Sequence, residues 1–128
     1  MATVGVKVNG ARELRKAIKQ AEDQDLKGEL RQAYRQAANI IVTRAKDLAP
    51  RVSGDLAGTI RPLGGIAAAV VAAGNAKVPY SAPIHWGWPK RGIAAQPFIA
   101  DALKDEWDRV YQTFNEAIDR VTEHINNN

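Results

Sequence analysis

The stretch "GGIAAAVVAAGN", residues 64–75, decides the fold class that the sequence predicts. It is a compact apolar run, 66–74, and glycine or asparagine at both ends favours turns there. The many alanines are also compatible with a helix, but the run is only about one strand long. We therefore expect a buried strand here, in a chain that otherwise looks helical.

Two long helical patterns lie on either side of this strand. The first runs from Leu26 to about Leu48, with Asp25 as a plausible cap, and must stop before Pro50, because the residue preceding a proline is disfavoured in the α conformation. The second begins at Pro97 and continues to the end of the chain. The predicted buried stripes are Leu30, Tyr34, Ala37, Ile41, Ala45 and Leu48 in the first helix, and Ile99, Leu103, Trp107, Val110, Phe114, Ile118, Val121 and Ile125 in the second.

Shorter elements complete the predicted fold. Residues 3–8 alternate and predict a first strand, and a short helix is expected from about Ala11. Residues 49–65 are expected to form a loop and a strand edge, and 76–87 another strand, bent by its prolines. The fold class is thus α+β: residues 1–128 form one domain, in which both long helices pack on one face of a small antiparallel sheet.

The composition narrows the class of protein. Charged residues make up 25% and hydrophobic residues 45%, as in ordinary globular domains. There is no cysteine, which excludes a disulfide framework, a thiolate metal site and a cysteine nucleophile. The N-terminus lacks the pattern of a signal peptide, and the longest apolar run is far below the ~20 residues that span a bilayer. We expect a soluble protein with no membrane partner.

Charge is unevenly distributed along the chain, whose net charge is +4. Residues 1–64 carry twelve basic and seven acidic groups, whereas residues 65–128 carry six and seven. The first long helix is basic, and the second, with seven acids and three bases over 98–125, is acidic. This asymmetry suits attraction to DNA, and it suits equally the self-association of a basic face with an acidic one.

The sequence shows no set of residues for catalysis, metal binding or cofactor binding. His85 and His124 are the only conventional bases, and His124 is expected to be structural near a helix C-terminus. Ser53 is not in a nucleophile-elbow motif, and no phosphate-binding glycine motif occurs. We expect no cofactor and no enzymatic activity, although a role for His85 as a general base stays as a third hypothesis.

The stretch "YSAPIHWGWPKRG", residues 80–92, carries the strongest functional signal. It joins aromatic residues to cations, and residues 77–92 contain no acid. Such a segment can stack bases and neutralise phosphates, which would make the protein a small nucleic-acid-binding module. Alternatively, its tryptophans anchor the loop under the last helix or against a neighbouring subunit. The residues concerned in the nucleic-acid hypothesis are Lys77, Trp86, Trp88, Lys90 and Arg91.

Three blocks occur in order along residues 45–103. They are "AKDLAPRVSGDLAGTI" at the end of the first long helix, "VPYSAPIHWGWPKRG" after the apolar strand, and "AAQPFIADAL" at the start of the last helix. In this order the blocks resemble the family of tailed-phage head–tail joining proteins typified by gene product ten of HK-type lambdoid phages. The matching residues are Ala49, Pro50, Ser53, Gly54, Leu56 and Ile60, then Tyr80, Ile84 and Gly87, then Ala95, Pro97, Phe98, Ile99 and Ala102.

Two positions depart from the family pattern. His85 stands where the family usually has a glutamate, and Ser81 replaces a small alanine. The resemblance implies that Tyr80 and Ile84 pack inward and that Gly87 permits a turn.

The resemblance implies a structural virion protein of a siphophage, located in the tail or neck and assembled in the host cytoplasm. It would form a ring, typically a hexamer, that terminates the tail tube or joins the tail to the head connector. Its partners would be further copies of itself and the connector, stopper and tail-tube proteins, with non-specific contact to DNA in the lumen. The basic and acidic helices would offer complementary subunit faces. The residues expected at assembly contacts are Ser53, Gly54, Leu56, Tyr80, His85, Trp86, Gly87, Trp88, Lys90, Arg91, Pro97 and Phe98.

Overall fold

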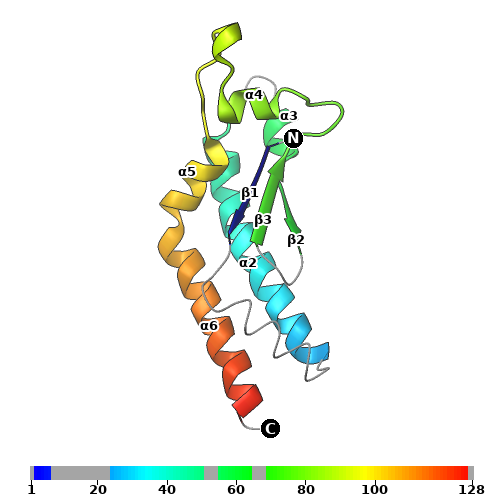
Figure 1. Ribbon diagram of the computed structural model, residues 1–128, viewed down its shortest axis with the longest axis vertical. Helices are drawn as coiled ribbons and strands as arrows, with labels where there is room; N and C mark the ends of the chain where they lie inside the picture. Colours follow the sequence, from blue (N-terminus) through cyan, green and yellow to red (C-terminus); the bar gives the residue numbers. More distant parts are fainter. Residues whose placement is uncertain (1, 7–23, 51–54, 65–68, 127–128) are drawn as a thin grey trace.

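The protein has the predicted α+β fold, in which helices pack on a three-stranded antiparallel sheet (Figure 1). The computed structural model describes residues 2–6, 24–50, 55–64 and 69–126. In chain order the elements are β1 (Ala2–Val6), α2 (Gln24–Leu48), α3 (Asp55–Gly58), β2 (Arg61–Gly64), β3 (Ala69–Ala73), α4 (Ser81–Trp86), the 3₁₀ turn η1 (Pro89–Arg91), α5 (Phe98–Asp105) and α6 (Trp107–Asn126).

The apolar run that decided the fold class is the central strand of the sheet. The strand order is β1-β3-β2, so β3 is hydrogen-bonded on both edges. Val71 lies opposite Val4 of β1 and Pro62 of β2, and both pairings are antiparallel. The prediction of a buried strand over 66–74 is confirmed for the residues of β3.

The inner face of the sheet packs against α2. Alternate residues of β3, namely Ala69, Val71 and Ala73, belong to the hydrophobic core, as expected for a period of two. The buried face of α2 is also rich in alanine, including Ala38 and Ala45. Small side chains on both surfaces let the helix axis approach the strands closely. The predicted end of this helix before Pro50 is confirmed, and Asp25 lies inside its first turn rather than at the cap.

Helices α5 and α6 pack along α2, with α6 running antiparallel to it (Figure 1). Two ion pairs join them: Arg44 to Asp105 at 3.0 Å, and Arg120 to Glu29 at 2.7 Å. The basic helix α2 and the acidic segment formed by α5 and α6 therefore pair within one molecule. Since these partly exposed pairs contribute little stability, their main effect is to select the pairing of the helices.

The prediction of one continuous C-terminal helix from Pro97 is wrong in one respect, because the helix is divided at Glu106 into α5 and α6. The backbone there has φ −105° and ψ 13°, yet the amide of Glu106 still donates to Ala102 O at 3.0 Å. Trp107, expected on the buried stripe, is exposed. Two successive steps of four residues from Ile99 rotate a side chain by about 80° around a helix, away from the core. The buried residues are Phe98, Ile99, Ala102, Val110, Phe114, Ala117 and Val121.

The prediction of a strand over 76–87 is also wrong. The segment makes one isolated bridge, between Asn75 and Val78, and then forms the short helix α4. Pro83 is the third residue of α4, a first-turn position whose amide needs no intrahelical partner. Proline is therefore compatible with this helix, although it was interpreted as a bend in a strand.

The first strand, predicted at 3–8, is confirmed for residues 3–6 as part of β1, and residues 7 and 8 lie outside the described residues. The short helix expected from about Ala11, together with Ser53 and Gly54, lies outside the described residues. Within the described ranges, no helix combines the length and the apolar character that crossing a membrane requires.

Candidate assembly interface

Residues 87–96 rise beyond one end of the molecule and return to it, linking α4 to α5 (Figure 1). We call this segment the projecting arm. Its two sides pair through Trp88 and Ile93, whose amides each donate to the carbonyl of the other, at 2.8 and 3.1 Å. The turn between them is η1, which ends at Gly92 in the left-handed conformation with φ 68°. The arm is thus a hydrogen-bonded loop with a defined shape.

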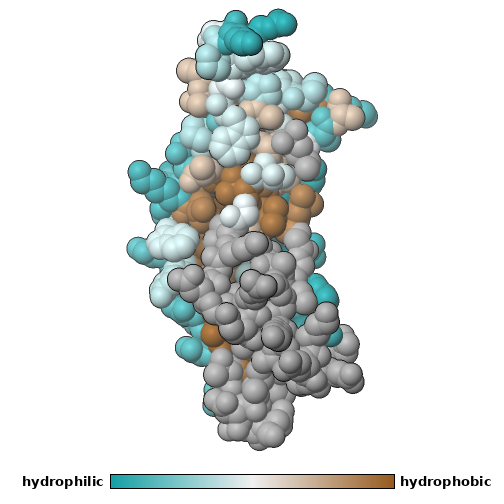
Figure 2. Space-filling view, in the orientation of Figure 1, coloured by the Kyte–Doolittle hydropathy of each residue, from teal (hydrophilic) through white to brown (hydrophobic). Residues whose placement is uncertain are grey.

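The outer surface of the arm is aromatic and basic. Trp86, at its base, and Trp88 expose 56% and 42% of their surfaces. The guanidinium carbon of Arg91 lies 5.1 Å from the centre of the Trp88 ring, a cation–π arrangement. Lys90 is exposed beside it, and the end of the molecule that carries the arm is hydrophilic in Figure 2. All four of these residues are exposed, and the structure shows a contact between Arg91 and Trp88.

A buried polar cluster holds the end of β3 against the start of α4. The amide of Gly74 donates to the Thr59 hydroxyl at 2.8 Å, and Arg61 donates to the carbonyls of Gly74 and Thr59 at 2.9 and 2.7 Å. The Ser81 hydroxyl donates to Ala73 O at 3.0 Å. Since Gly74 and Ser81 are buried, these bonds satisfy groups that water cannot reach.

A glycine turn connects α4 to the arm. Gly87 has φ 82°, and a side chain there would lie 3.0 Å from the amide nitrogen of Ala95. The turn expected at Gly87 is therefore confirmed. On the returning side, the Gln96 amide donates to Ile84 O at 2.8 Å, which closes the base of the arm.

His85 lies directly beneath the arm and is fully buried. Its ring packs edge-on against Trp86 and Phe98, with centroid distances of 4.1 and 5.0 Å. Its Nε2 accepts a hydrogen bond from the amide of Ala100 at 3.4 Å, whereas Nδ1 has no partner among the described residues. Ala100 is the third residue of α5, and the cap residue Pro97 offers no side-chain bond. His85 therefore supplies an acceptor to one of the unpaired amides at this helix N-terminus.

The environment of His85 favours its neutral form. Burial lowers the pKa of the imidazole below its usual 6.5, and the Asp101 carboxylate opposes this shift only in part. Protonation would remove the acceptor on Nε2 and place a positive charge at the positive end of the α5 dipole. The side chain is therefore a structural acceptor between α4 and α5.

We expect the stability of the protein to decrease as the pH falls through 6.5. In that range the unfolded chain gains a proton on His85 while the folded chain keeps the residue neutral, so acid favours unfolding. Urea unfolding between about pH 7.5 and about pH 5.5 would measure the slope. His85→Gln keeps an acceptor but does not titrate, and its slope should be smaller than that of the wild type. Equal slopes would contradict this assignment.

The expected contact residues divide into two groups in the structure. Tyr80, which was predicted to pack inward, is exposed. Ile84 is partly buried and packs against the core, as predicted. The side chains of Leu56 and Phe98 are core residues, and Pro97 is partly buried, so these three support the fold and are no longer proposed as contacts. The outward-facing candidates are Tyr80, Trp86, Trp88, Lys90 and Arg91.

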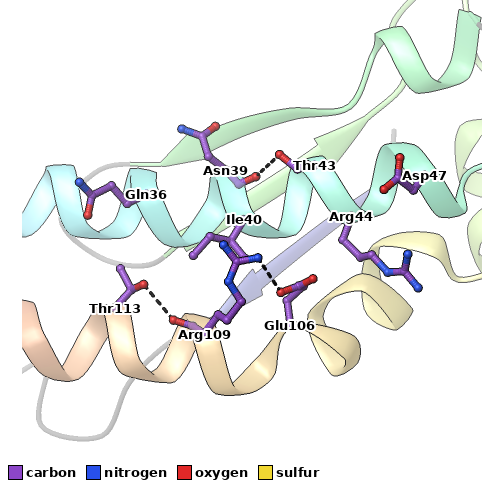
Figure 3. Close-up of a pocket in the computed structure, with 9 residues that line it drawn as sticks. All are labelled: Gln36, Asn39, Ile40, Thr43, Arg44, Asp47, Glu106, Arg109 and Thr113. Atoms are coloured by element: carbon purple, nitrogen blue, oxygen red, sulfur yellow. Dashed lines mark hydrogen bonds and ion pairs between the residues drawn. The ribbon is translucent and has the colours of Figure 1, made fainter.

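An open groove of about 610 Å³ lies between α2 and the start of α6 (Figure 3). Its two arginines are paired with carboxylates: Arg109 with Glu106 at 3.1 Å, and Arg44 with Asp105 at 3.0 Å. The hydroxyls of Thr43 and Thr113 donate to carbonyls of their own helices. The described residues include no cluster of three or more potential metal ligands. The groove thus presents no converging catalytic or ligating groups.

A second aromatic surface, which was not predicted from the sequence, is formed by Trp107 and Tyr111 on α6; these residues are 46% and 50% exposed. Strict counting at 3.6 residues per turn would have placed Trp107 off the buried stripe.

Comparison of the chain with protein-family models, curated protein sequences and solved structures gave no match.

Proposed function

We propose that this chain is a structural virion protein of a tailed phage, which forms a ring at the neck or at the head-proximal end of the tail. In this role it terminates the tail tube or joins the tail to the head connector, and it catalyses no reaction. The observation that carries the proposal is the projecting arm: a shaped loop with exposed tryptophans and cations, anchored in the core by α4 and α5. Aromatic residues and arginine are the side chains that most often anchor protein interfaces.

The three blocks that carry the family resemblance meet at one end of the molecule. Leu56 from the first block, Ile84 from the second and Phe98 from the third all belong to, or pack on, the same core. In Figure 1, α3, α4 and the start of α5 lie together at the end that bears the arm. Parts of all three blocks therefore lie close together in the fold, which supports treating them as one family pattern.

The histidine that replaces the expected glutamate is also consistent with the proposal. At position 85 the side chain accepts a hydrogen bond from the N-terminus of α5. A carboxylate would accept the same bond and interact favourably with the helix dipole. Neutral histidine and glutamate can therefore serve the same structural purpose here.

Loss of the gene from its phage tests the function. We expect intact heads and separate tails, or tails of abnormal length, in negative-stain electron micrographs, with normal particles restored by the gene supplied in trans. Labelled protein should localise to the neck or the upper tail of purified particles. Normal particles formed without the gene would reject the proposal.

The alternative is a nucleic-acid-binding module, which the aromatic and basic surface of the arm favours. Because Trp86 and Trp88 are exposed, their fluorescence should respond to a bound oligonucleotide. A titration with single-stranded and duplex DNA at two salt concentrations measures this directly. Tight binding that weakens steeply with salt would favour the alternative.

A further inference from the structure

Four residues of α5 and α6 form a surface that we call the acceptor patch: Asp101, Trp107, Asp108 and Tyr111. The two aromatic rings stack, with centroids 6.2 Å apart and planes at 29°. Both carboxylates are exposed, and neither has a salt-bridge partner among the described residues. Asp108 lies three residues before Tyr111 on α6, so these two share one side of that helix, whereas Asp101 lies on α5, before the break at Glu106. It offers a preformed aromatic plane beside negative charge.

The projecting arm has the complementary character. Trp88, Lys90 and Arg91 combine an exposed ring with two cations, and no acid lies in 77–92. Neither patch carboxylate is ion-paired among the described residues, and of the exposed cations close to them in the sequence, Lys104 and Arg109, the second pairs with Glu106. An arm docked there would stack its tryptophan on the aromatic pair and place its cations near the carboxylates. Such pairing adds specificity and speeds association.

Three of the four patch residues, Trp107, Asp108 and Tyr111, lie on α6, whereas Asp101 lines a small pocket with Ala95 and Gln96 of the arm. The arm extends beyond the end of the body, whereas α6 runs from its junction with α5 toward the opposite end (Figure 1). We propose that the projecting arm of one copy binds the acceptor patch of a neighbouring copy. This inference rests on the proposed function, since it names the contact through which the ring would form.

An arm-to-patch contact is heterologous, because each copy uses two different surfaces. Each bound copy therefore still offers a free arm and a free patch. Such contacts close into a ring when the rotation between neighbours permits it, and they form open chains otherwise. A heterologous contact also differs from a two-fold symmetric dimer in a testable way: a variant altered only in the arm can still bind a variant altered only in the patch.

Charge reversal tests the pairing in the full chain. Lys90→Glu with Arg91→Glu should weaken self-association in sedimentation velocity by roughly 10- to 100-fold. Asp101→Lys with Asp108→Lys should do the same. Combining all four changes in one chain should restore association in part, because the charges are exchanged. The matched control for the arm is Arg35→Glu with Lys46→Glu, which makes the same charge change on exposed positions of α2 and should have little effect.

Mixing the two double variants gives the sharper result. The intact arm of the patch variant can bind the intact patch of the arm variant, and the two reversed surfaces are also complementary in charge, so the mixture should associate although each variant alone does not. Removing aromatic side chains instead leaves a single intact contact in the mixture. Trp88→Ala leaves the patch intact, and Trp107→Ala with Tyr111→Ala leaves the arm intact. Each alone should be largely monomeric, and their equimolar mixture should form dimers through the one intact arm and the one intact patch.

The outcomes separate this inference from the proposed function. A wild-type chain that stays monomeric, or variants that associate as the wild type does, would overturn the pairing even if loss of the gene leaves heads and tails unjoined. Rescue by the mixture would support the pairing even if the particles form normally without the gene. Arm variants that lose DNA binding but keep self-association would assign the arm to nucleic acid and also overturn it. Circular dichroism should show native helix content in every variant, since all the altered side chains are exposed.

Discussion

Gly74→Ala is expected to lower the free energy of unfolding by about 3 to 5 kcal/mol, since it combines backbone strain with overpacking. Gly74 has φ +95°, a conformation that residues with a side chain rarely adopt. An added methyl group would lie 2.8 Å from Ser81 Cβ and 3.0 Å from Val78 O. The backbone around it is held by Thr59 and Arg61 and cannot shift without breaking buried hydrogen bonds. Urea unfolding followed by circular dichroism measures the change.

Gly28→Ala is the matched control, because it makes the same chemical change inside α2. An added methyl group there meets no atom within 4 Å. Alanine should stabilise this helix by about 0.5 to 1 kcal/mol, because glycine loses more conformational entropy on folding. The two substitutions should therefore have opposite signs. A Gly74→Ala protein within about 1 kcal/mol of the wild type would contradict the tight packing assigned to this turn.

Phe98→Ala is expected to cost about 3 to 5 kcal/mol, the usual range for deleting a buried aromatic side chain. Phe98 is only 2% exposed, and its ring packs edge-on against His85. Its removal leaves a cavity at the junction of α4 and α5, where the arm is anchored. We therefore expect both a lower midpoint of urea unfolding and weaker self-association.

Trp107→Ala provides the comparison for Phe98→Ala. Trp107 is also aromatic and also begins a helix, but it is half exposed and lies outside the core. Its loss should change the free energy of unfolding by no more than about 0.5 kcal/mol. It should nevertheless impair self-association if the acceptor patch is used. Equal destabilisation by the two substitutions would contradict the assignment of Phe98 to the core.

Local sequence patterns predicted most of the regular elements. The apolar run bounded by glycines is β3, and the helical pattern from Leu26 to Leu48 corresponds to α2 within two residues. These predictions succeeded because burial on one face imposes a period of two or of 3.6 on a single segment. The segment around α4 was predicted wrongly, because prolines in the first turn of a short helix resemble those of a bent strand.

The candidate site was only partly visible in the sequence. The association of Trp86, Trp88, Lys90 and Arg91 could be recognised because these residues are neighbours along the chain. The burial of His85 could not, since it depends on Phe98 and Ala100, which arrive from another element. The exposure of Trp107 agrees with strict counting at 3.6 residues per turn from Ile99, whereas the break at Glu106 could not be recognised.

By itself, the sequence determined the fold class, the central strand, the span of α2 and the aromatic and basic character of residues 80–92. Each of these depends on residues close together in the chain, whose spacing and chemistry can be read directly. Only the tertiary structure decided that the basic and acidic helices pair within one molecule, that His85 is an internal acceptor, and that the arm projects away from α6. Those features depend on how distant segments pack together, and packing selects among several arrangements that the same local patterns allow.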